Sequence, residues 1–234
     1  MGMPEPIALR AFETPGNDTY LGVAQYQEIH APIAQVAAVI DDYPHYPDLF
    51  DDLIRAEVRS NENGALVLFT EQRIPAPFVP NEENEMMYRI ESVQANPSRA
   101  ASKSYLYQLR SSKNLKFNDG LILLTQAGEN LTIYSEIDFW DAEWGFIKSF
   151  GAKRIWASSL RALAQADLAI KLQAEHPEWD RRRSKKESEK QAQQIAVDPI
   201  YRDRLPVSAI FPETLSSPYP SASPSISPSS AHSQ

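Results

Sequence analysis

The chain contains no cysteine, and this absence excludes several classes of protein at once. A disulfide framework, a thiolate metal site and a cysteine nucleophile all need this residue, which occurs nowhere in the 234 residues. Glycine is also scarce, at 8 residues. The sequence has no P-loop, no Rossmann glycine fingerprint and no Gly-x-Ser-x-Gly elbow. Classical nucleotide sites and serine hydrolase chemistry are therefore disfavoured.

Long apolar runs are absent as well. No segment approaches the ~20 apolar residues of a membrane-spanning helix, and the first twenty residues hold no apolar stretch of signal-peptide length. Gly2 follows Met1, but Pro6 stands where a myristoylation motif needs Ser or Thr. We therefore expect no stable membrane anchor, and a cytoplasmic protein if Met1 is the true start.

Basic charge is lacking in the larger part of the chain. Residues 1–178 hold 15 Lys and Arg against 25 Asp and Glu, a balance of −10, whereas residues 179–234 hold 8 against 6, a balance of +2. An acidic body repels phosphate backbones, and no segment carries a basic stripe with interleaved aromatic residues. Nucleic acid is not expected as the primary partner.

The segment from Tyr20 to Phe50 is the most informative part of the sequence. Residues 20–29 alternate with partly apolar residues on both faces, which predicts a strand. Pro32 then starts a short amphipathic helix, with apolar residues at three- and four-residue spacing up to Ile40. Because Pro44 and Pro47 cannot continue a helix, an aromatic-proline corner follows.

The pattern I-x-A-P-I-x-x-V-x-x-V-I-D-D-Y-P-x-Y-P, which begins at Ile29, resembles the opening of the START-like (SRPBCC) superfamily. This helix-grip group includes polyketide cyclases, coenzyme Q-binding proteins and plant pollen allergens of the same shape. The resemblance covers roughly residues 19–175. It implies an α+β helix-grip fold, in which a curved antiparallel β-sheet wraps around a long C-terminal α-helix and two short helices follow the first strand. The family's signature is one of element order, so it indicates a fold more strongly than a function.

The rest of this region alternates strand patterns with turn residues. We predict strands over 53–59, 65–73, 85–93, 101–109, 115–126 and 131–142. Asn63-Gly64 indicates a hairpin, and Asn118-Asp119-Gly120 predicts a bulge or bend within its strand. The proline-rich segment 74–80 cannot join a central strand, and we expect it to form a lid beside the rim of the sheet.

The period of the pattern becomes helical from about residue 144 or 146 and stays so to about residue 175. Small residues such as Gly151, Ser158 and Ala162 lie on or beside the apolar stripe of this helix. Two alternatives follow. The helix leaves space for a ligand above the sheet, or its small residues allow a close approach and a dry, solid core.

Composition divides the chain into three parts. We expect an N-terminal extension over 1–18, the helix-grip domain over 19–176, and a charged, then Ser/Pro-rich and largely disordered tail over 177–234. Within the tail, residues 180–194 are compatible with a continuation of the long helix or with a separate exposed helix. The tail offers a tether, a modification target or a contact for a protein partner, or has no role.

Metal and cofactor chemistry finds little support. None of the four histidines is spaced with a second histidine or a carboxylate as in known metal motifs, so we predict no metal and no cofactor. His45 lies among aspartates and tyrosines, which suits an acid or base. Acidic residues at turns are commonly solvated caps, however, and this interpretation is favoured; no catalytic residue is predicted.

The binding site is predicted from aromatic residues at even offsets within strands, although core packing explains most of them equally well. Arginines within strands or the long helix are added because a guanidinium can hold a polar head group. The predicted ligand-binding residues are Tyr43, Tyr46, Phe50, Phe78, Tyr88, Arg89, Tyr105, Tyr107, Phe117, Ile137, Phe139, Arg154 and Ser158.

The predicted function is noncatalytic binding or transport of a hydrophobic small molecule, such as a lipid or a quinone-like or polyketide-like compound, between the sheet and the long helix. The corner at 43–50 and the loop at 75–80 would form the entrance. Two alternatives stay open: an enzyme of the polyketide cyclase or aromatase type, and a module that contacts a protein or the ribosome.

Overall fold

The computed structural model describes residues 8–13, 21–62, 64–73, 81–97, 99–142 and 147–194. Side chains are described from residue 22 onward, except at 62, 140–142 and 147–159. The predicted lid at 74–80 and the chain beyond 194 lie outside the described residues. All described residues belong to one unit, Met1–Arg202; the second unit, Asp203–Gln234, lies outside them.

Eight strands form one antiparallel sheet in the order β1-β2-β8-β7-β6-β5-β4-β3. Every pair except β2 and β8 joins strands that are consecutive in the sequence, so the sheet is built almost wholly from hairpins. The strands are β1 (Ala8–Glu13), β2 (Leu21–Ile29), β3 (Leu53–Glu62), β4 (Ala65–Gln72), β5 (Glu82–Val93), β6 (Ser102–Ser112), β7 (Leu115–Gly128) and β8 (Leu131–Ala142).

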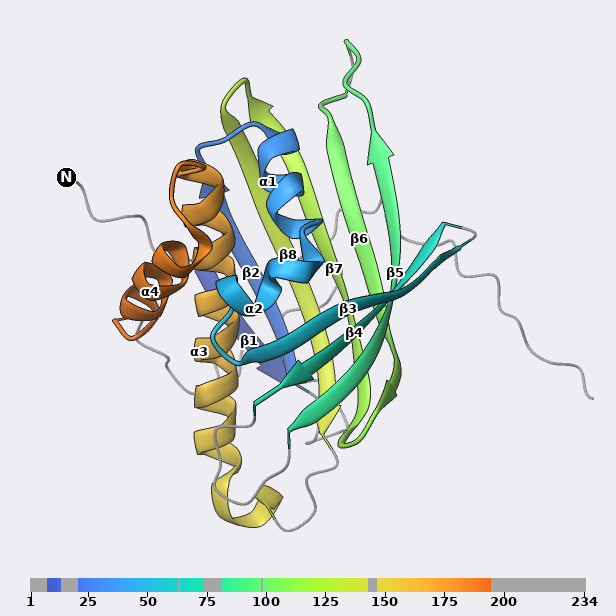
Figure 1. Cartoon of the computed structure of the whole chain (residues 1–234), viewed down its shortest axis with the longest axis vertical. Coiled ribbons are helices and arrows are strands. Elements are labelled where there is room, and N and C mark those ends of the chain that lie inside the picture. The colour runs from blue at the N-terminus through green and yellow to red at the C-terminus, as the bar shows by residue number, and fades with distance from the viewer. Residues whose placement is uncertain are drawn as a thin grey trace, which may run out of the picture. The chain divides into compact units, whose positions relative to one another are not determined.

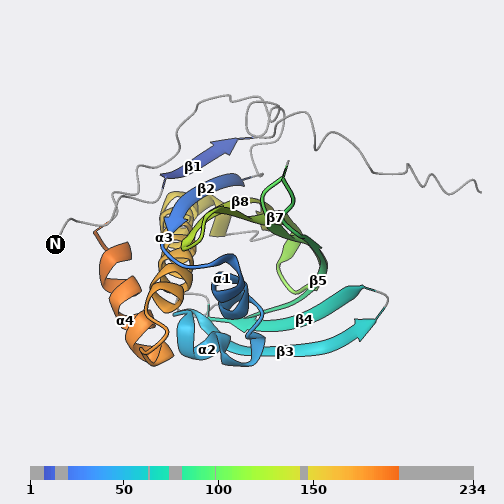
Figure 2. The ribbon, with the colours of Figure 1, turned by 90° about the horizontal axis from the view of Figure 1, so that it is seen from above.

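The sheet curves around the helices. Figure 2 shows β1 and β2 on one side of the curve and β3 and β4 on the other, with α1 (Ile33–Ile40) between them and α3 (Ile147–Glu175) across the opening. A 3-10 turn, η1 (Tyr43–His45), and one turn of helix, α2 (Tyr46–Leu49), link α1 to β3. The last helix, α4 (Arg181–Ala192), lies beside α3 on its outer side (Figures 1 and 2).

Local sequence explains where α1 begins and ends. Pro32 is its N-cap, and the next residue, Ile33, donates its backbone N–H to Gln126 Oε1 at 2.8 Å. This bond satisfies one of the N–H groups that a helix start leaves without an intrahelical partner. Val36, Ala37 and Ile40 face the core and are buried. The helix therefore seats its apolar stripe inside the curve of the sheet.

The main core joins α1, the sheet and the second half of α3. Tyr105 and Tyr134 are fully buried there beside Ile29 and Val36, and Ile170 of α3 completes the contact. The sheet and α3 thus share one apolar core at the end that α1 covers. Polar side chains replace it farther along the same face, as described below.

Helix α4 is attached to α3 by side-chain hydrogen bonds between glutamine and serine. Gln165 Nε2 donates to Ser188 Oγ at 2.7 Å, and Ser184 Oγ donates to Gln173 Oε1 at 2.9 Å. Both serines are fully buried. Lys185, between them, donates from Nζ to the backbone oxygens of Phe50 at 2.9 Å and of Pro47 at 3.2 Å. Helix α4 therefore connects α3 to the end of α2.

The predicted helix-grip fold is confirmed, and two details differ. The sequence patterns do not predict β1, which adds an edge strand beside β2, so the short helices follow the second strand of the sheet. A bulge or bend is expected at 118–120, and the pairing of β7 with β6 ends there, at Asp119. On the other side, Asn118, Asp119 and Gly120 pair with β8 in regular register, and the shifts of that ladder lie between Leu115 and Phe117 and between Gln126 and Gly128. Of the two alternatives for residues 180–194, the structure has a separate helix.

Candidate functional site

Polar residues occupy the inner face of the sheet where β2 pairs with β8. Gln25 lies opposite Glu136, Gln27 lies opposite Tyr134, and Val23 lies opposite Asp138. Because successive side chains of a strand point to opposite faces, these residues all face α3. Gln25, Gln27 and Asp138 are no more than 5% exposed. We refer to Gln25, Gln27, Tyr134, Glu136, Asp138, Tyr107 and Asp167 as the interior polar cluster.

Glu136 is the centre of this cluster. Its Oε2 accepts a hydrogen bond from the Tyr134 hydroxyl at 2.7 Å and one from Gln25 Nε2 at 3.2 Å. Its Oε1 accepts one from the Tyr107 hydroxyl at 3.0 Å. The glutamate keeps some accessible surface although it lies within the sheet on the face that α3 covers. Glu136 is therefore held by three hydrogen bonds and stays partly accessible.

Asp167 brings a second carboxyl to Glu136 from the opposite layer. It lies on α3, is 2% exposed, and its carboxyl interacts with the Glu136 carboxyl and the Tyr134 hydroxyl. Two carboxyls in direct contact are stable only if one of them holds a proton. Burial raises the pKa of the Asp167 carboxyl well above its usual range, and the nearby charge of Glu136 adds to this effect.

The other two carboxyls are shifted in the same direction. Burial raises the pKa of Glu136, although hydrogen bonds from Tyr134 and Tyr107 partly counteract it. Burial and the neighbouring charge of Glu136 raise the pKa of Asp138 well above its usual range. The interior therefore holds three carboxyls that favour their protonated form more than a solvated carboxyl does.

Several polar atoms of the interior have no hydrogen-bond partner. Within the cluster these atoms are Gln25 Oε1, Gln27 Oε1, Asp138 Oδ1 and Asp167 Oδ2. A buried polar atom without a partner costs free energy, on the order of 1–3 kcal/mol each. Water or a ligand can satisfy such atoms.

A row of aromatic rings leads from this cluster to the corner after α1. The rings of Tyr107 and Tyr88 are 5.6 Å apart, and those of Tyr88 and Tyr43 are 6.4 Å apart. Tyr46 lies 5.4 Å from Tyr43 and 4.7 Å from Phe50. The Tyr46 hydroxyl donates to the backbone oxygen of Ile40 at 2.5 Å, which fixes the corner to the end of α1. We call these five side chains the aromatic row.

The structure brings together six of the thirteen predicted site residues. Five form the aromatic row, and Tyr105 packs beside them in the core with its hydroxyl 3.1 Å from Asp41 Oδ1. Phe78 lies outside the described residues, and so do the side chains of Arg154 and Ser158.

The remaining four predicted residues lie on the opposite face of the sheet. Ile137 and Phe139 alternate with Glu136 and Asp138 along β8 and so point away from α3. Phe117 pairs with Asp141 and shares their face, while Arg89 follows Tyr88 directly and is exposed. The reason is that both faces of these strands carry apolar residues, so hydrophobicity alone does not tell which face is inside.

Sequence reasoning misses the polar half of the site. Gln25 and Gln27 share the face of Val23 and Ile29, and Glu136 and Asp138 share that of Tyr134. Polar residues at alternate positions usually indicate a solvated face. Gln25 and Glu136 are 111 residues apart in the sequence. Only the pairing of β2 with β8 shows that the polar faces of these two strands lie side by side inside the domain.

The arrangement gives no support for a metal centre. No group of His, Asp and Glu in the described part of the chain has a geometry that could hold a metal ion. His45 lies on the surface with its Nδ1 2.7 Å from Asp42 Oδ1, away from the carboxyls of the interior polar cluster.

Comparison with known proteins shows the fold. No family model and no curated protein matches this sequence. Among solved structures, human STARD10 superposes with a TM-score of 0.60 at 12% identity, over 86% of this chain and 82% of that chain. The chain has the START-like helix-grip fold.

Two bacterial proteins share this START-like fold. The STAR-related lipid transfer protein from Xanthomonas axonopodis gives a TM-score of 0.57 at 10% identity, over 74% of this chain and 96% of that one. The Zhui aromatase/cyclase from Streptomyces sp. R1128 gives 0.54 at 14% identity, over 68% and 96%. At these identities the likeness concerns the fold and not the chemistry.

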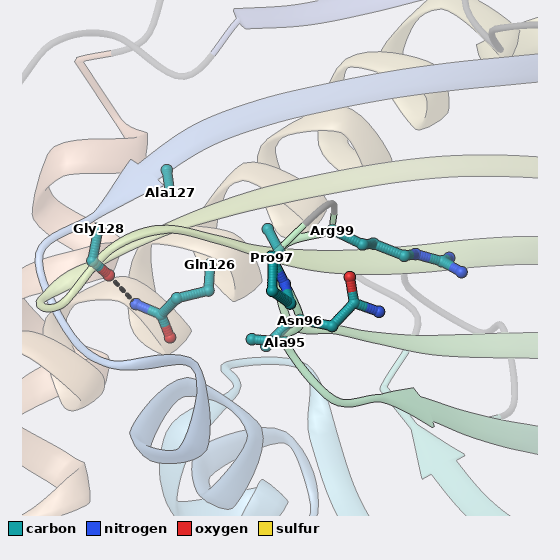
Figure 3. A pocket seen from close by; sticks show the side chains of 9 residues that line it. Ala95, Asn96, Pro97, Arg99, Gln126, Ala127 and Gly128 are labelled. Atoms are coloured by element: carbon teal, nitrogen blue, oxygen red, sulfur yellow. Dashed lines mark hydrogen bonds between the residues drawn. The ribbon is translucent and has the colours of Figure 1, made fainter.

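A separate hollow lies at the surface of the START-like domain, where the β5–β6 connection meets the end of β7 (Figure 3). It has a volume of about 430 Å³, is open to solvent and is lined by Ala95, Asn96, Pro97, Arg99, Ala100, Ala101, Gln126, Ala127 and Gly128. The side-chain oxygen of Gln126 accepts from the backbone N–H of Ile33, and its side-chain nitrogen donates to the Gly128 carbonyl, as Figure 3 shows. This hollow has no carboxyl and no aromatic side chain, and we do not assign it a role.

Within the described ranges, no helix is long and apolar enough to cross a membrane.

Proposed function

We propose that this START-like domain binds a hydrophobic small molecule with a polar end, between the sheet and α3, without covalent chemistry. The observation that carries the proposal is the interior polar cluster, whose carboxylate and amide oxygens are buried without partners. A ligand that supplies those partners recovers the free energy that the empty site lacks.

The aromatic row suits the apolar part of such a molecule. Its rings offer broad apolar walls, and Tyr88 keeps some accessible surface although it faces the inside of the sheet. The row runs from Tyr107, which contacts Glu136, to the corner that includes Phe50. The names of two proteins with this fold, a lipid transfer protein and an aromatase/cyclase, support hydrophobic ligands as the class.

Native mass spectrometry tests this proposal. The purified full-length protein is compared under native and denaturing conditions, together with an organic extract of the same sample. We expect a stoichiometric apolar compound that leaves on denaturation. If the folded protein is empty and its melting temperature does not respond to a panel of lipids, quinones and polyketide analogues, the proposal is wrong.

A matched pair of variants links the binding to this site. Tyr88→Ala removes one wall of the aromatic row and should lower the occupancy severalfold. Arg89→Ala changes the next residue of the same strand, on the opposite and exposed face, and should leave the occupancy unchanged. Equal loss in both variants would indicate that the ligand lies elsewhere.

A second candidate function is an enzyme of the polyketide cyclase or aromatase type. The contact between Glu136 and Asp167 favours it, because burial raises the pKa of both carboxyls and a pair of carboxyls can pass a proton to and from a substrate. Mass analysis of polyketide analogues incubated with the protein would detect dehydrated or cyclised products, and Glu136→Gln should abolish them.

Three further expectations stay predictions from the sequence. They are the cytoplasmic location, the three domain boundaries and a protein partner for residues 177–234.

A further inference from the structure

Three carboxyls share the interior, and no cation among the described side chains lies beside them. Glu136 and Asp138 come from β8 and Asp167 from α3, and in the described part of the chain none of the three forms an ion pair with Lys, Arg or His. The groups that shift their pKa are other carboxyls, tyrosine hydroxyls and backbone. Buried carboxyls normally have a cationic partner or bind a metal, and the described residues provide neither.

The partners that the cluster lacks are hydrogen-bond donors. Gln25 is 3% exposed and already uses its amide nitrogen on Glu136, which leaves its Oε1 free. Gln27 is 5% exposed and donates its nitrogen to the backbone oxygen of Asp167 at 2.9 Å, which again leaves Oε1 free. Asp138 Oδ1 and Asp167 Oδ2 are acceptors as well when their carboxyls are ionised. All four unpartnered atoms of the cluster can therefore accept a hydrogen bond from a donor.

We propose that the molecule bound in this interior carries a protonated amine, which donates its N–H groups to those of these oxygens that lie nearest Glu136. This inference rests on the proposed binding function. A primary ammonium group has three donors, a positive charge and no acceptor, and so complements the cluster in both respects. A hydroxyl group brings one donor and no charge, and a carboxylate brings only acceptors. The aromatic row then holds the apolar part, with ring faces that also attract a cation.

Three probes with the same ten-carbon chain separate these head groups: n-decylammonium, n-decanol and n-decanoate. Isothermal titration at pH 7, below the micellar range, gives a dissociation constant for each with the full-length protein. We expect the amine to bind at least about tenfold more tightly than either other probe, since charge-assisted hydrogen bonds are the stronger kind.

Variants assign this preference to the cluster. Glu136→Gln combined with Asp167→Asn replaces two ionisable carboxyls by amides at nearly constant volume and should reduce the preference for the amine over decanol to less than about threefold. Glu82→Gln is the control. Glu82 is 2% exposed at the other end of the inner face, where Ser112 and Asn114 already satisfy it. This change should not affect the preference for the amine.

Proton release gives a second measurement in case the double variant does not fold. Among the described side chains, the titratable groups of this interior are Glu136 and Asp138 with Tyr134 from β8, Tyr107 from β6 and Asp167 from α3. An ammonium group favours the ionised carboxyls, so its binding should release protons, seen as a dependence of the measured heat on the buffer's ionisation enthalpy. Decanol should release none.

The outcomes distinguish the two proposals. If decanol or decanoate binds as tightly as the amine, or the amine binds without proton release, the amine inference is wrong and hydrophobic binding stands. A preference that survives the double variant also overturns the inference, because the cluster is then not its cause. If none of the probes binds, both proposals fail.

Discussion

The ring of Tyr107 lies directly over Gly120 of the neighbouring strand. The two residues are paired in the β6–β7 ladder, and a methyl group at position 120 would lie 2.3 Å from both Cζ and the hydroxyl oxygen of Tyr107. Only glycine allows the tyrosine to lie flat across β7 and reach Glu136. The glycine therefore serves the site, and its strand stays in regular register there.

Replacing Gly120 with alanine should displace Tyr107 and destabilise the protein. The added methyl would also lie 2.7 Å from the backbone oxygen of Ile137, which cannot move aside easily. Overpacking of this kind typically costs about 1–3 kcal/mol of unfolding free energy, measurable by urea unfolding. Gly128→Ala is the control, because a methyl there meets only Leu131 Cβ at 3.5 Å. Equal effects of the two changes would contradict the proposed role of Gly120.

The interior carboxyls should make the protein less stable as the pH rises above about 4. Burial raises the pKa of Glu136, Asp138 and Asp167, so the folded state holds protons that the unfolded state has already released. Their stabilising contribution is complete below the unfolded pKa of about 4 and is lost as the pH rises through the folded pKa. A tenfold difference in proton affinity between the folded and unfolded states corresponds to about 1.4 kcal/mol of unfolding free energy.

Thermal unfolding between about pH 4.5 and 8 measures this effect, because the range begins just above the unfolded pKa of the carboxyls. The double variant Glu136→Gln, Asp167→Asn should show a flatter dependence than the original protein. Glu91→Gln, which changes an exposed carboxyl on β5, should not flatten it. If the stability of the original protein and that of the double variant change with pH in the same way, the hypothesis of protonated interior carboxyls is wrong.

Six of the ten tyrosines should resist ionisation as long as the protein is folded. Burial raises the pKa of Tyr43, Tyr46, Tyr88, Tyr105, Tyr107 and Tyr134 above the ordinary value of 10.0. Absorbance at 295 nm near pH 11 should therefore report at most four tyrosinates in the folded protein and about ten in guanidinium. Because the folded state keeps these protons, the contribution of these tyrosines to stability is complete below about pH 10 and is lost as the pH rises further. More than four tyrosinates with unchanged circular dichroism would contradict this burial.

Lys185 should contribute to stability although it is a lysine on a charged helix. Its ammonium group donates to the Phe50 and Pro47 carbonyls at the end of α2. Lys185→Met keeps the aliphatic stem and leaves these carbonyls without the donor, which should cost about 1–2 kcal/mol of unfolding free energy. Lys186→Met, at the exposed next position, should change it by less than about 0.5 kcal/mol. A similar cost for both lysines would indicate that charge alone is responsible.

The sequence predicts the fold well because its signals are local. Alternation over residues 131–142 is enough to predict β8, and Pro32 with the apolar positions up to Ile40 is enough to predict α1. The short strand β1 escapes prediction because its sequence ALRAFE carries no clear alternation and no hairpin residues. Its place is decided by pairing with β2, a contact that a local pattern does not express.

The sequence predicts only the aromatic half of the site for the same reason. Tyr88, Tyr105 and Tyr107 belong to strands with an evident inner face, and Tyr43 lies at a corner defined by prolines. Glu136 and Asp138 escape prediction because a polar residue in a strand is normally expected to face water. Their position depends on α3, which brings Asp167 from about thirty residues later in the chain.

The bonds of Lys185 have a consequence for the kinetics of exchange. The carbonyls that it holds belong to the same turn as Phe50, the outermost ring of the aromatic row. A molecule that leaves through this corner must move that turn and thereby break the attachment of α4. Hydrogen–deuterium exchange of the α4 amides and the dissociation rate of the bound molecule should therefore increase together, so that a helix without any contact to the ligand governs how long the ligand stays.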